Sequence, residues 1–166
     1  VSTAQSALTS SIVSAQTSII SNTDDAHTAL ARANMDGSNV SGKSSELATA
    51  LTGSFSAASA NTFSARISIT NADYTAAELK IINTATTGDI YLHTTDTALS
   101  GSAADLLIAL SGDHNFTGDV TVNDSSTTNI PATTLSSIGG KTTGTVTVTN
   151  AVNIQGNTDQ VTAALV

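Results

Sequence analysis

The segment Gly37–Ser44 satisfies the phosphate-loop pattern Gly-x-x-x-x-Gly-Lys-Ser/Thr. In such a loop the backbone amides hold phosphates, the lysine reaches the outer phosphates and the last hydroxyl binds Mg²⁺. The pattern requires a buried apolar strand before it, whereas Ala31–Asp36 stand there. Gly42 also belongs to an internal repeat whose other copies have no lysine after the glycine. Nucleotide binding through Gly37–Ser44 is therefore a distant alternative.

The histidines and aspartates do not form a metal-binding pattern. The histidines are His27, His93 and His114. No two of them have the i,i+4 spacing that places metal ligands on one helix face. Several aspartates lie near expected strand ends: Asp73, Asp89, Asp96, Asp119 and Asp124. They lack the regular ligand spacing of a calcium loop, so turn and capping roles are expected.

No serine lies in a Gly-x-Ser-x-Gly elbow, and no histidine stands beside a serine in the sequence. The sequence therefore predicts no catalytic, cofactor-binding or metal-binding residue. We expect a protein without enzymatic activity.

The composition is that of a polar, acidic, repetitive protein. Charged residues make up 11% of the chain, against roughly 25% in ordinary domains. The formal net charge of −8 disfavours nucleic acid as a partner. Aromatic residues reach only 3%, which favours thin layers of small apolar side chains over one thick core. No apolar run is long enough to span a membrane.

The first domain, residues 1–35, has the heptad pattern of a helix that forms a coiled coil. Its apolar seam alternates steps of four and three and contains one polar residue, which would fix the register. The seam residues are Leu8, Ile12, Ala15, Ile19, Asn22, Ala26, Ala29 and Ala33. A parallel homotrimer is the favoured oligomer and a dimer the weaker option. The alternative is an amphipathic helix that packs on its own domain.

An internal repeat follows, in residues 39–51, 98–110 and 153–165, here called repeat units 1, 2 and 3. Each has an apolar residue, a spacer and a glycine, followed by small or polar residues and a helical pattern that ends in Ala and Leu. The glycines lie 59 and 55 residues apart. Residues 36–64 form a linker with the first partial repeat, and residues 65–166 form the repeat domain.

Short strands alternate with short helices in this repeat domain. Period-two strands are expected at residues 66–70, 88–93, 119–123 and 144–149. Helices are expected at residues 76–85 and 102–110, after Pro131, and at the chain end. Such alternation, with strand starts about every 23 to 30 residues, predicts a mixed α/β solenoid with one parallel sheet backed by helices.

The apolar residues of these strands and helices are the predicted solenoid core. They are Ile67, Ile69, Leu79, Ile82, Ile90, Leu92, Leu106, Leu110, Val120, Val122, Leu135, Val146, Val148, Val161 and Leu165. We expect the apolar residues of strand 66–70 to stack on those of strand 88–93. We likewise expect Val120 and Val122 to stack on Val146 and Val148.

The segments Val120–Asp124 and Gly144–Asn150, with the helix motifs at Asp105–Leu107 and Gln160–Val161, resemble a known group of repeats. These are the tandem repeats of giant cell-surface proteins of marine cyanobacteria and of fibre and virion proteins of their phages. The resemblance covers residues 65–166 and implies a structural or adhesive role without catalytic residues. The N-terminal segment is similar to the shaft of a trimeric phage fibre or adhesin.

These features predict a structural protein of a phage virion, with a bacterial cell-surface adhesin or extracellular matrix segment as the alternative. Other virion or surface proteins are the expected partners, and the expected location is the virion or the cell surface. Repeat unit 3 ends inside its helix without a polar cap, which leaves an apolar edge. We therefore expect the chain to continue beyond Val166 or another subunit to cover this end.

Overall fold

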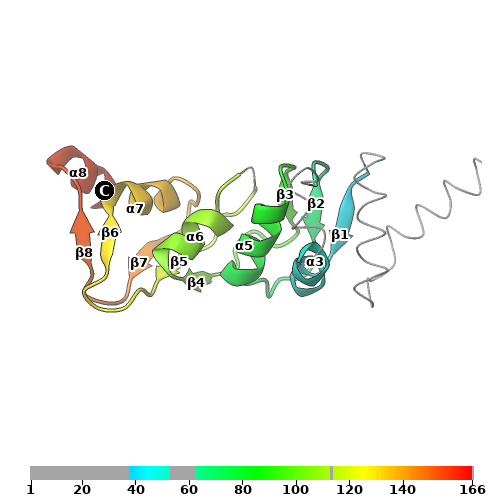
Figure 1. Ribbon diagram of the computed structural model, residues 1–166, viewed down its shortest axis with the longest axis horizontal. Helices are drawn as coiled ribbons and strands as arrows, with labels where there is room; N and C mark the ends of the chain where they lie inside the picture. The colour runs from blue at the N-terminus through cyan, green and yellow to red at the C-terminus, as the bar shows by residue number, and fades with distance from the viewer. Residues whose placement is uncertain (1–37, 53–62, 113, 166) are drawn as a thin grey trace, which may run out of the picture.

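The computed structural model describes residues 38–52, 63–112 and 114–165. This part of the chain is mixed α/β, with short helices and three-residue strands. Its helices are α3 (Ser44–Leu51), α5 (Ala76–Ala85), α6 (Ala103–Ala109), α7 (Ala132–Gly139) and α8 (Thr158–Leu165). Its strands are β1 (Val40–Gly42), β2 (Ile67–Ile69), β3 (Ile90–Leu92), β4 (Leu99–Gly101), β5 (Val120–Val122), β6 (Asn129–Pro131), β7 (Val146–Val148) and β8 (Asn153–Gln155). Figure 1 shows these elements along one axis, from β1 and α3 to β8 and α8.

We call a helix together with the strands that directly precede it a layer. The described residues form five layers: β1–α3, β2–α5, β3–β4–α6, β5–β6–α7 and β7–β8–α8. Consecutive layers contact each other through the helix pairs α3–α5, α5–α6, α6–α7 and α7–α8. The strands of consecutive layers also pair, and each of these pairings is parallel.

The strand register confirms both predicted stacks. Ile67 lies opposite Ile90 in the β2–β3 pair, and Val120 lies opposite Val146 in the β5–β7 pair. The next apolar positions of the same strands follow in register. Because side chains alternate across a strand, this register places the apolar residues of consecutive layers on the same side of the sheet.

The prediction of one sheet with strictly alternating strands and helices is wrong. The described strands form three sheets, with the orders β1-β2-β3, β4-β5-β7 and β6-β8. From α5 onward two strands, rather than one, separate successive helices. Each of the extra strands β4, β6 and β8 has only one apolar residue, so no period-two pattern marks it in the sequence. Strand β6 also lacks the glycine that marks the three repeat units, because Pro131 pairs with Gln155 and Ala132 follows where Gly156 stands after β8.

Local sequence signals explain where the helices begin. Helix α5 has the predicted bounds, and Thr75 and Glu78 form a capping box before it. The N–H of Glu78 donates to Thr75 Oγ1 over 3.3 Å, and the N–H of Thr75 donates to Glu78 Oε2 over 2.9 Å. Ser102 accepts a hydrogen bond from the N–H of Asp105 and so caps α6. Pro131 stands just before α7, where its missing N–H is not needed.

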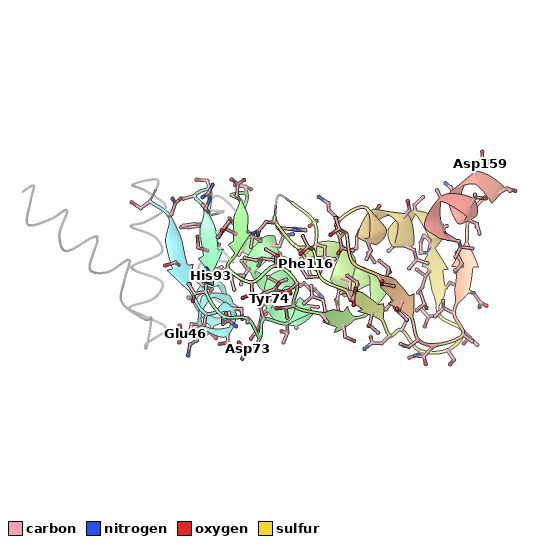
Figure 2. The ribbon with its side chains drawn as sticks, turned by 180° about the vertical axis from the view of Figure 1, so that it is seen from behind. Glu46, Asp73, Tyr74, His93, Phe116 and Asp159 are labelled. Atoms are coloured by element: carbon pink, nitrogen blue, oxygen red, sulfur yellow. The ribbon has the colours of Figure 1, made fainter. Side chains whose placement is uncertain are left out.

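The predicted core residues are buried in the first four described layers and become exposed in the last. The buried ones are Ile67, Ile69, Leu79, Ile82, Ile90, Leu92, Leu106, Leu110, Val120, Val122 and Leu135. Val146, Val148 and Val161 are only partly buried. Leu165 departs from the prediction, because 67% of it is exposed. Tyr74 and Phe116 add aromatic side chains to the interior, whereas Asp159 lies on the outer surface of α8 (Figure 2).

Two Thr-Thr-Gly turns hold consecutive layers close together. Thr86 Oγ1 donates to the carbonyl oxygen of Phe63 and accepts from the N–H of Gly88. Thr142 Oγ1 repeats this pattern with the carbonyl oxygen of Gly118 and the N–H of Gly144. A Cβ atom at either turn glycine would lie far inside van der Waals contact with the backbone of the previous layer. Glycine is therefore required at these positions for close packing.

The predicted coiled-coil seam from Leu8 to Ala33 lies outside the described residues. Among the helices that the structure describes, none is both long enough and apolar enough to cross a bilayer.

Candidate interaction surface

The described residues of the phosphate-loop motif form hydrogen bonds with other residues of the fold. Val40–Gly42 is strand β1, and its carbonyl at Gly42 accepts from the N–H of Thr70 over 3.0 Å. Ser44 is 1% exposed, and its hydroxyl donates to Glu78 Oε2 over 3.0 Å. Its N–H donates to Asn71 Oδ1 over 2.8 Å. The amide and the hydroxyl that would meet phosphate and Mg²⁺ thus bind neighbouring side chains, which disfavours the nucleotide-binding reading.

The described histidines and aspartates are dispersed. His93 is exposed at the end of β3, and His114 lies in the following layer with Nε2 2.7 Å from the carbonyl oxygen of Leu110. Within residues 38–52, 63–112 and 114–165, no three His, Cys, Asp or Glu side chains lie close enough to hold a metal ion. His27 lies outside the described residues.

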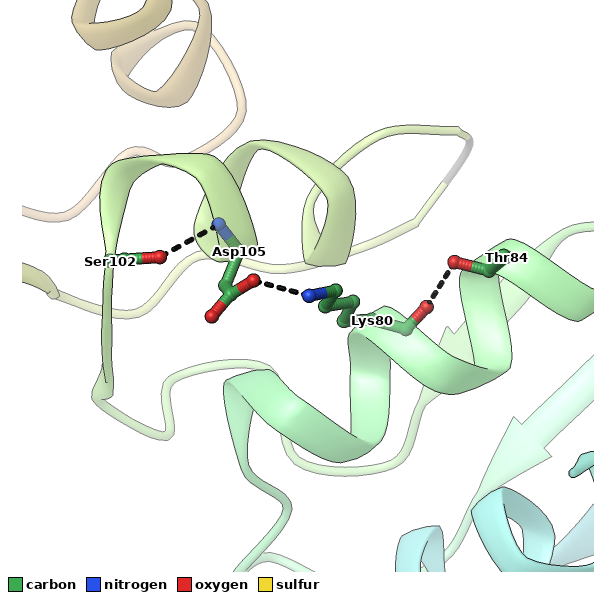
Figure 3. A network of polar contacts seen from close by, with 4 residues as sticks. All are labelled: Lys80, Thr84, Ser102 and Asp105. Carbon is green, nitrogen blue, oxygen red and sulfur yellow. Dashed lines mark hydrogen bonds and ion pairs between the residues drawn. The ribbon is translucent and has the colours of Figure 1, made fainter. Parts of the chain in front are cut away.

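A polar network joins α5 to α6. Lys80 Nζ donates to Asp105 Oδ1, and the N–H of Asp105 donates to Ser102 Oγ (Figure 3). The hydrogen bond with Lys80 is the main reason that the pKa of Asp105 is lower than its ordinary value, and the hydrogen bond with Ser102 lowers this pKa further. Thr84 Oγ1 donates to the carbonyl oxygen of Lys80, within the same helix. Because the Lys80 and Asp105 side chains are 40% and 45% exposed, this network holds neighbouring layers together without enclosing a reactive site.

Two helices are capped by side chains from the next layer. Asn71, two residues after β2, accepts from the N–H of Ser44 at the start of α3. Asp124, two residues after β5, accepts from the N–H of Ala103 at the start of α6 over 2.7 Å. Ser44 and Ala103 occupy the same place in repeat units 1 and 2, two residues after the glycine. The sequence analysis did not predict this contact, although Asn71 and Asp124 both stand two residues after an apolar-polar-apolar strand.

The last two described layers enclose an open groove, which we call the end face. Its volume is about 550 Å³, and it lies between α7, β7, β8 and α8. Apolar and small residues line it, among them Leu135, Gly139, Val146, Val148, Ile154 and Ala164. Strands β7 and β8 are the last in their sheets, and no residue of α8 is fully buried. The end face is the part of the described structure with the character of an interaction surface.

Comparison with known proteins gave no match. No protein-family model matches the chain, and no match was found among curated proteins or among solved structures. A function for this chain must therefore be argued from its own geometry.

Proposed function

We propose that this chain is a non-enzymatic structural protein of a phage virion, a component of a fibre or appendage built as a small α/β solenoid. The observation that carries this proposal is the contact of each described layer with its neighbours in sequence, through parallel strands and helix pairs. Repeat proteins bury their core in this way. Their length grows with the number of repeats, which suits an elongated component.

The use of the polar side chains supports the same role. Asp119 Oδ1 accepts from the N–H of Thr145, and Asn153 Nδ2 donates to Asn129 Oδ1. These partners lie 26 and 24 residues apart, about one layer of chain. Catalytic side chains would instead converge on one place and leave polar atoms for a substrate. Here the polar atoms serve contacts between layers.

The location of the protein tests the virion assignment directly. We expect mass spectrometry of purified virions from the source to detect peptides from residues 63–165. Detection on the host cell surface, with none in virions, would support the alternative of a cell-surface adhesin. The two outcomes exclude each other when virions are separated from cell envelopes on a density gradient.

The N-terminal segment is proposed to form a parallel homotrimeric shaft. This part of the proposal rests on the heptad seam from Leu8 to Ala33 and on the similarity to fibre shafts. Sedimentation equilibrium of the intact chain should give the mass of three chains. A monomer at the highest soluble concentration would contradict it and favour a helix that packs on its own domain.

Nucleotide binding through Gly37–Ser44 is the remaining alternative, and a titration tests it. ATP with Mg²⁺ should cause no saturable heat signal in calorimetry, because the N–H and hydroxyl of Ser44 are bound to Asn71 and Glu78. Saturable binding that is lost in Lys43→Ala would overturn the structural assignment. Lys141→Ala is the matched control, because this lysine lies outside the motif.

A further inference from the structure

One exposed aromatic side chain departs from the pattern of the strands. In β1, β2, β4, β5 and β7 the middle residue is a serine or a threonine: Ser41, Ser68, Ser100, Thr121 and Thr147. In β3 the middle residue is Tyr91, which is 47% exposed. The other phenylalanine and tyrosine side chains that the structure describes are at most 4% exposed. Because a large ring in water gains no burial energy, the fold does not require a tyrosine here.

A pair of opposite charges lies beside this ring. Arg66 and Asp89 directly precede β2 and β3, and the N–H of Ile67 donates to the carbonyl oxygen of Asp89 over 2.9 Å. Since side chains alternate along a strand, both charged residues lie on the same side of the sheet as Tyr91, opposite to the buried Ile67 and Ile90. Arg66 Cζ lies 6.0 Å from the centroid of the Tyr91 ring, and Arg66 Nη2 lies 3.9 Å from Asp89 Oδ2.

The polar groups of these three side chains keep their capacity for hydrogen bonds. A separation of 3.9 Å is too long for a hydrogen bond between Arg66 and Asp89, and these side chains are 52% and 61% exposed. Among the described contacts, the guanidinium, the carboxylate and the Tyr91 hydroxyl form no hydrogen bond. Asp119, at the corresponding place before β5, instead accepts from the N–H of Thr145 over 2.7 Å. The group at β2 and β3 thus differs from the polar side chains that join layers.

The charges beside the ring limit the class of ligand. The Arg66 guanidinium disfavours a cation over the ring, and the Asp89 carboxylate disfavours an anion, as does the net charge of −8. A neutral ligand therefore fits best, with an apolar face for the ring and hydroxyl groups for the charged side chains. A pyranose sugar has both, because its C–H groups make one face apolar and each of its hydroxyls donates and accepts.

We propose that Arg66, Asp89 and Tyr91 form a binding site for a neutral pyranose sugar. The sugar packs its C–H face on the exposed part of the Tyr91 ring. Neighbouring hydroxyls accept from the Arg66 guanidinium and donate to the Asp89 carboxylate, in charge-assisted hydrogen bonds. This inference goes beyond the structural role proposed above and does not depend on it.

A panel of neutral trisaccharides of glucose, galactose and mannose is the probe, each titrated into the ¹⁵N-labelled full chain. At least one trisaccharide should bind saturably and shift the amides of β2 and β3, with those of α7 and α8 unchanged. Choline and glucose 6-phosphate are the charged probes and should shift none of these amides. A panel without a binder, or binding of the charged probes alone, would overturn the proposal.

Substitution of the ring tests whether Tyr91 makes the contact. Tyr91→Ser should weaken sugar binding at least about tenfold, because the stacking surface is lost. Its urea midpoint should stay close to that of the wild type, since serine occupies the same place in β2 and β4. Tyr91→Phe keeps the ring and should retain most of the affinity. Ile81→Ser is the matched control, because it removes an exposed apolar side chain from α5, outside the site.

Arg66→Gln and Asp89→Asn test the polar contacts. Each should weaken sugar binding about threefold or more, because one charge-assisted hydrogen bond becomes a neutral one. Binding that survives Tyr91→Ser, or that Ile81→Ser weakens to the same degree, would contradict the assignment of the site. Sugar binding by the purified chain and detection of the protein in virions are separate measurements, so the two proposals can fail separately.

Discussion

Glycines hold the places where the backbones of successive layers come closest. A Cβ atom at Gly144 would overlap the carbonyl group of Gly118 and the N–H of Asp119, both of which are backbone groups that cannot rotate away. We expect Gly144→Ala to lower the free energy of unfolding by at least about 2 kcal/mol, because β5 and β7 must separate locally. Urea unfolding followed by circular dichroism measures this change.

Gly139→Ala is the control for this substitution. Gly139 is the last residue of α7, and a Cβ atom there would meet no heavy atom within 4 Å. Its replacement should be neutral or stabilise the protein by up to about 1 kcal/mol, since alanine favours helix. Equal destabilisation by both substitutions would show that close packing of the layers is not the cause.

Thr127 has a positive φ of 71°, which is unusual for a β-branched residue. Two contacts with the next layer hold it there: its N–H donates to Ala151 O, and its carbonyl oxygen accepts from Asn153 Nδ2. Both use the Thr127 backbone, so Thr127→Asn keeps them and relieves strain. We expect a gain of about 1 kcal/mol in the free energy of unfolding. Thr128→Asn should bring no such gain, and a loss of stability in Thr127→Asn would contradict the argument.

The carboxylate of Asp105 predicts a pH dependence of stability. Its bonds with Lys80 and Ser102 lower its pKa from the ordinary 3.8 in the folded state. A lowered folded pKa stabilises the fold above the ordinary value, and this contribution is lost as the pH falls through the lower one. At pH 7 the urea midpoint of the wild type should therefore be higher than that of Asp105→Asn. The difference should be small, because the Lys80 and Asp105 side chains are partly exposed.

The difference between wild type and Asp105→Asn should shrink as the pH falls below the ordinary pKa of the carboxyl group and be lost once the pH is below its lowered folded-state pKa. Lys80→Met is the matched variant, since it keeps the bond between Asp105 and Ser102. The difference in urea midpoint between wild type and Lys80→Met should therefore depend on pH in the same direction but be smaller. A difference that stays constant from pH 7 to pH 2 would mean that ionisation of Asp105 does not contribute.

At the scale of the elements, the hydrogen bond between Asp124 and the first turn of α6 in the previous layer should contribute measurably to stability. Asp124→Ala removes the acceptor for the N–H of Ala103 and should cost about 1 kcal/mol of stability. Amide exchange should accelerate at the start of α6 and stay unchanged in α8. Asp124→Asn keeps an acceptor oxygen and should retain most of the stability. If Asp124→Ala and Asp124→Asn lose equal stability, the negative charge of Asp124, and not its hydrogen bond, is the cause.

The sequence predicted the longer elements well because they carry strong local signals. Helix α5 was predicted with its observed bounds from Leu79 and Ile82 on one apolar face, and the structure adds a capping box of Thr75 and Glu78 at its start. Strands β2, β3, β5 and β7 were predicted from their period-two apolar residues. Strands β4, β6 and β8 were not predicted, because each has a single apolar residue and therefore no period-two pattern.

At the scale of the whole molecule, the parallel pairing of layers was predictable, but the number of sheets was not. The repeat units set the order of strand and helix, and crossover connections require parallel strands. The division into three sheets depends on how the chain turns between two consecutive strands, such as β3 and β4, and no residue in that turn signals it. The end face was not predicted, because its groove depends on how α7, β7, β8 and α8 pack together.

The exposed end of the stack predicts that equivalent leucines have unequal energetic roles. Leu110→Ala should cost about 2–5 kcal/mol, because this buried leucine lies between two layers. Leu165→Ala, at the same place in the repeat, should change the stability of the free chain by less than about 0.5 kcal/mol, since the side chain already meets water. Urea unfolding of the two variants in parallel measures both values.

Comparing Leu110→Ala with Leu165→Ala tests whether neighbouring layers stabilise each other or are stable independently. In a stack, each layer is stabilised by its own contacts and by those with its neighbours, so the end layer has one interface fewer. Hydrogen exchange should therefore be fastest in α8 and slower in α6, which has helices on both sides. A large loss of stability in Leu165→Ala would mean that the end face is already covered in solution.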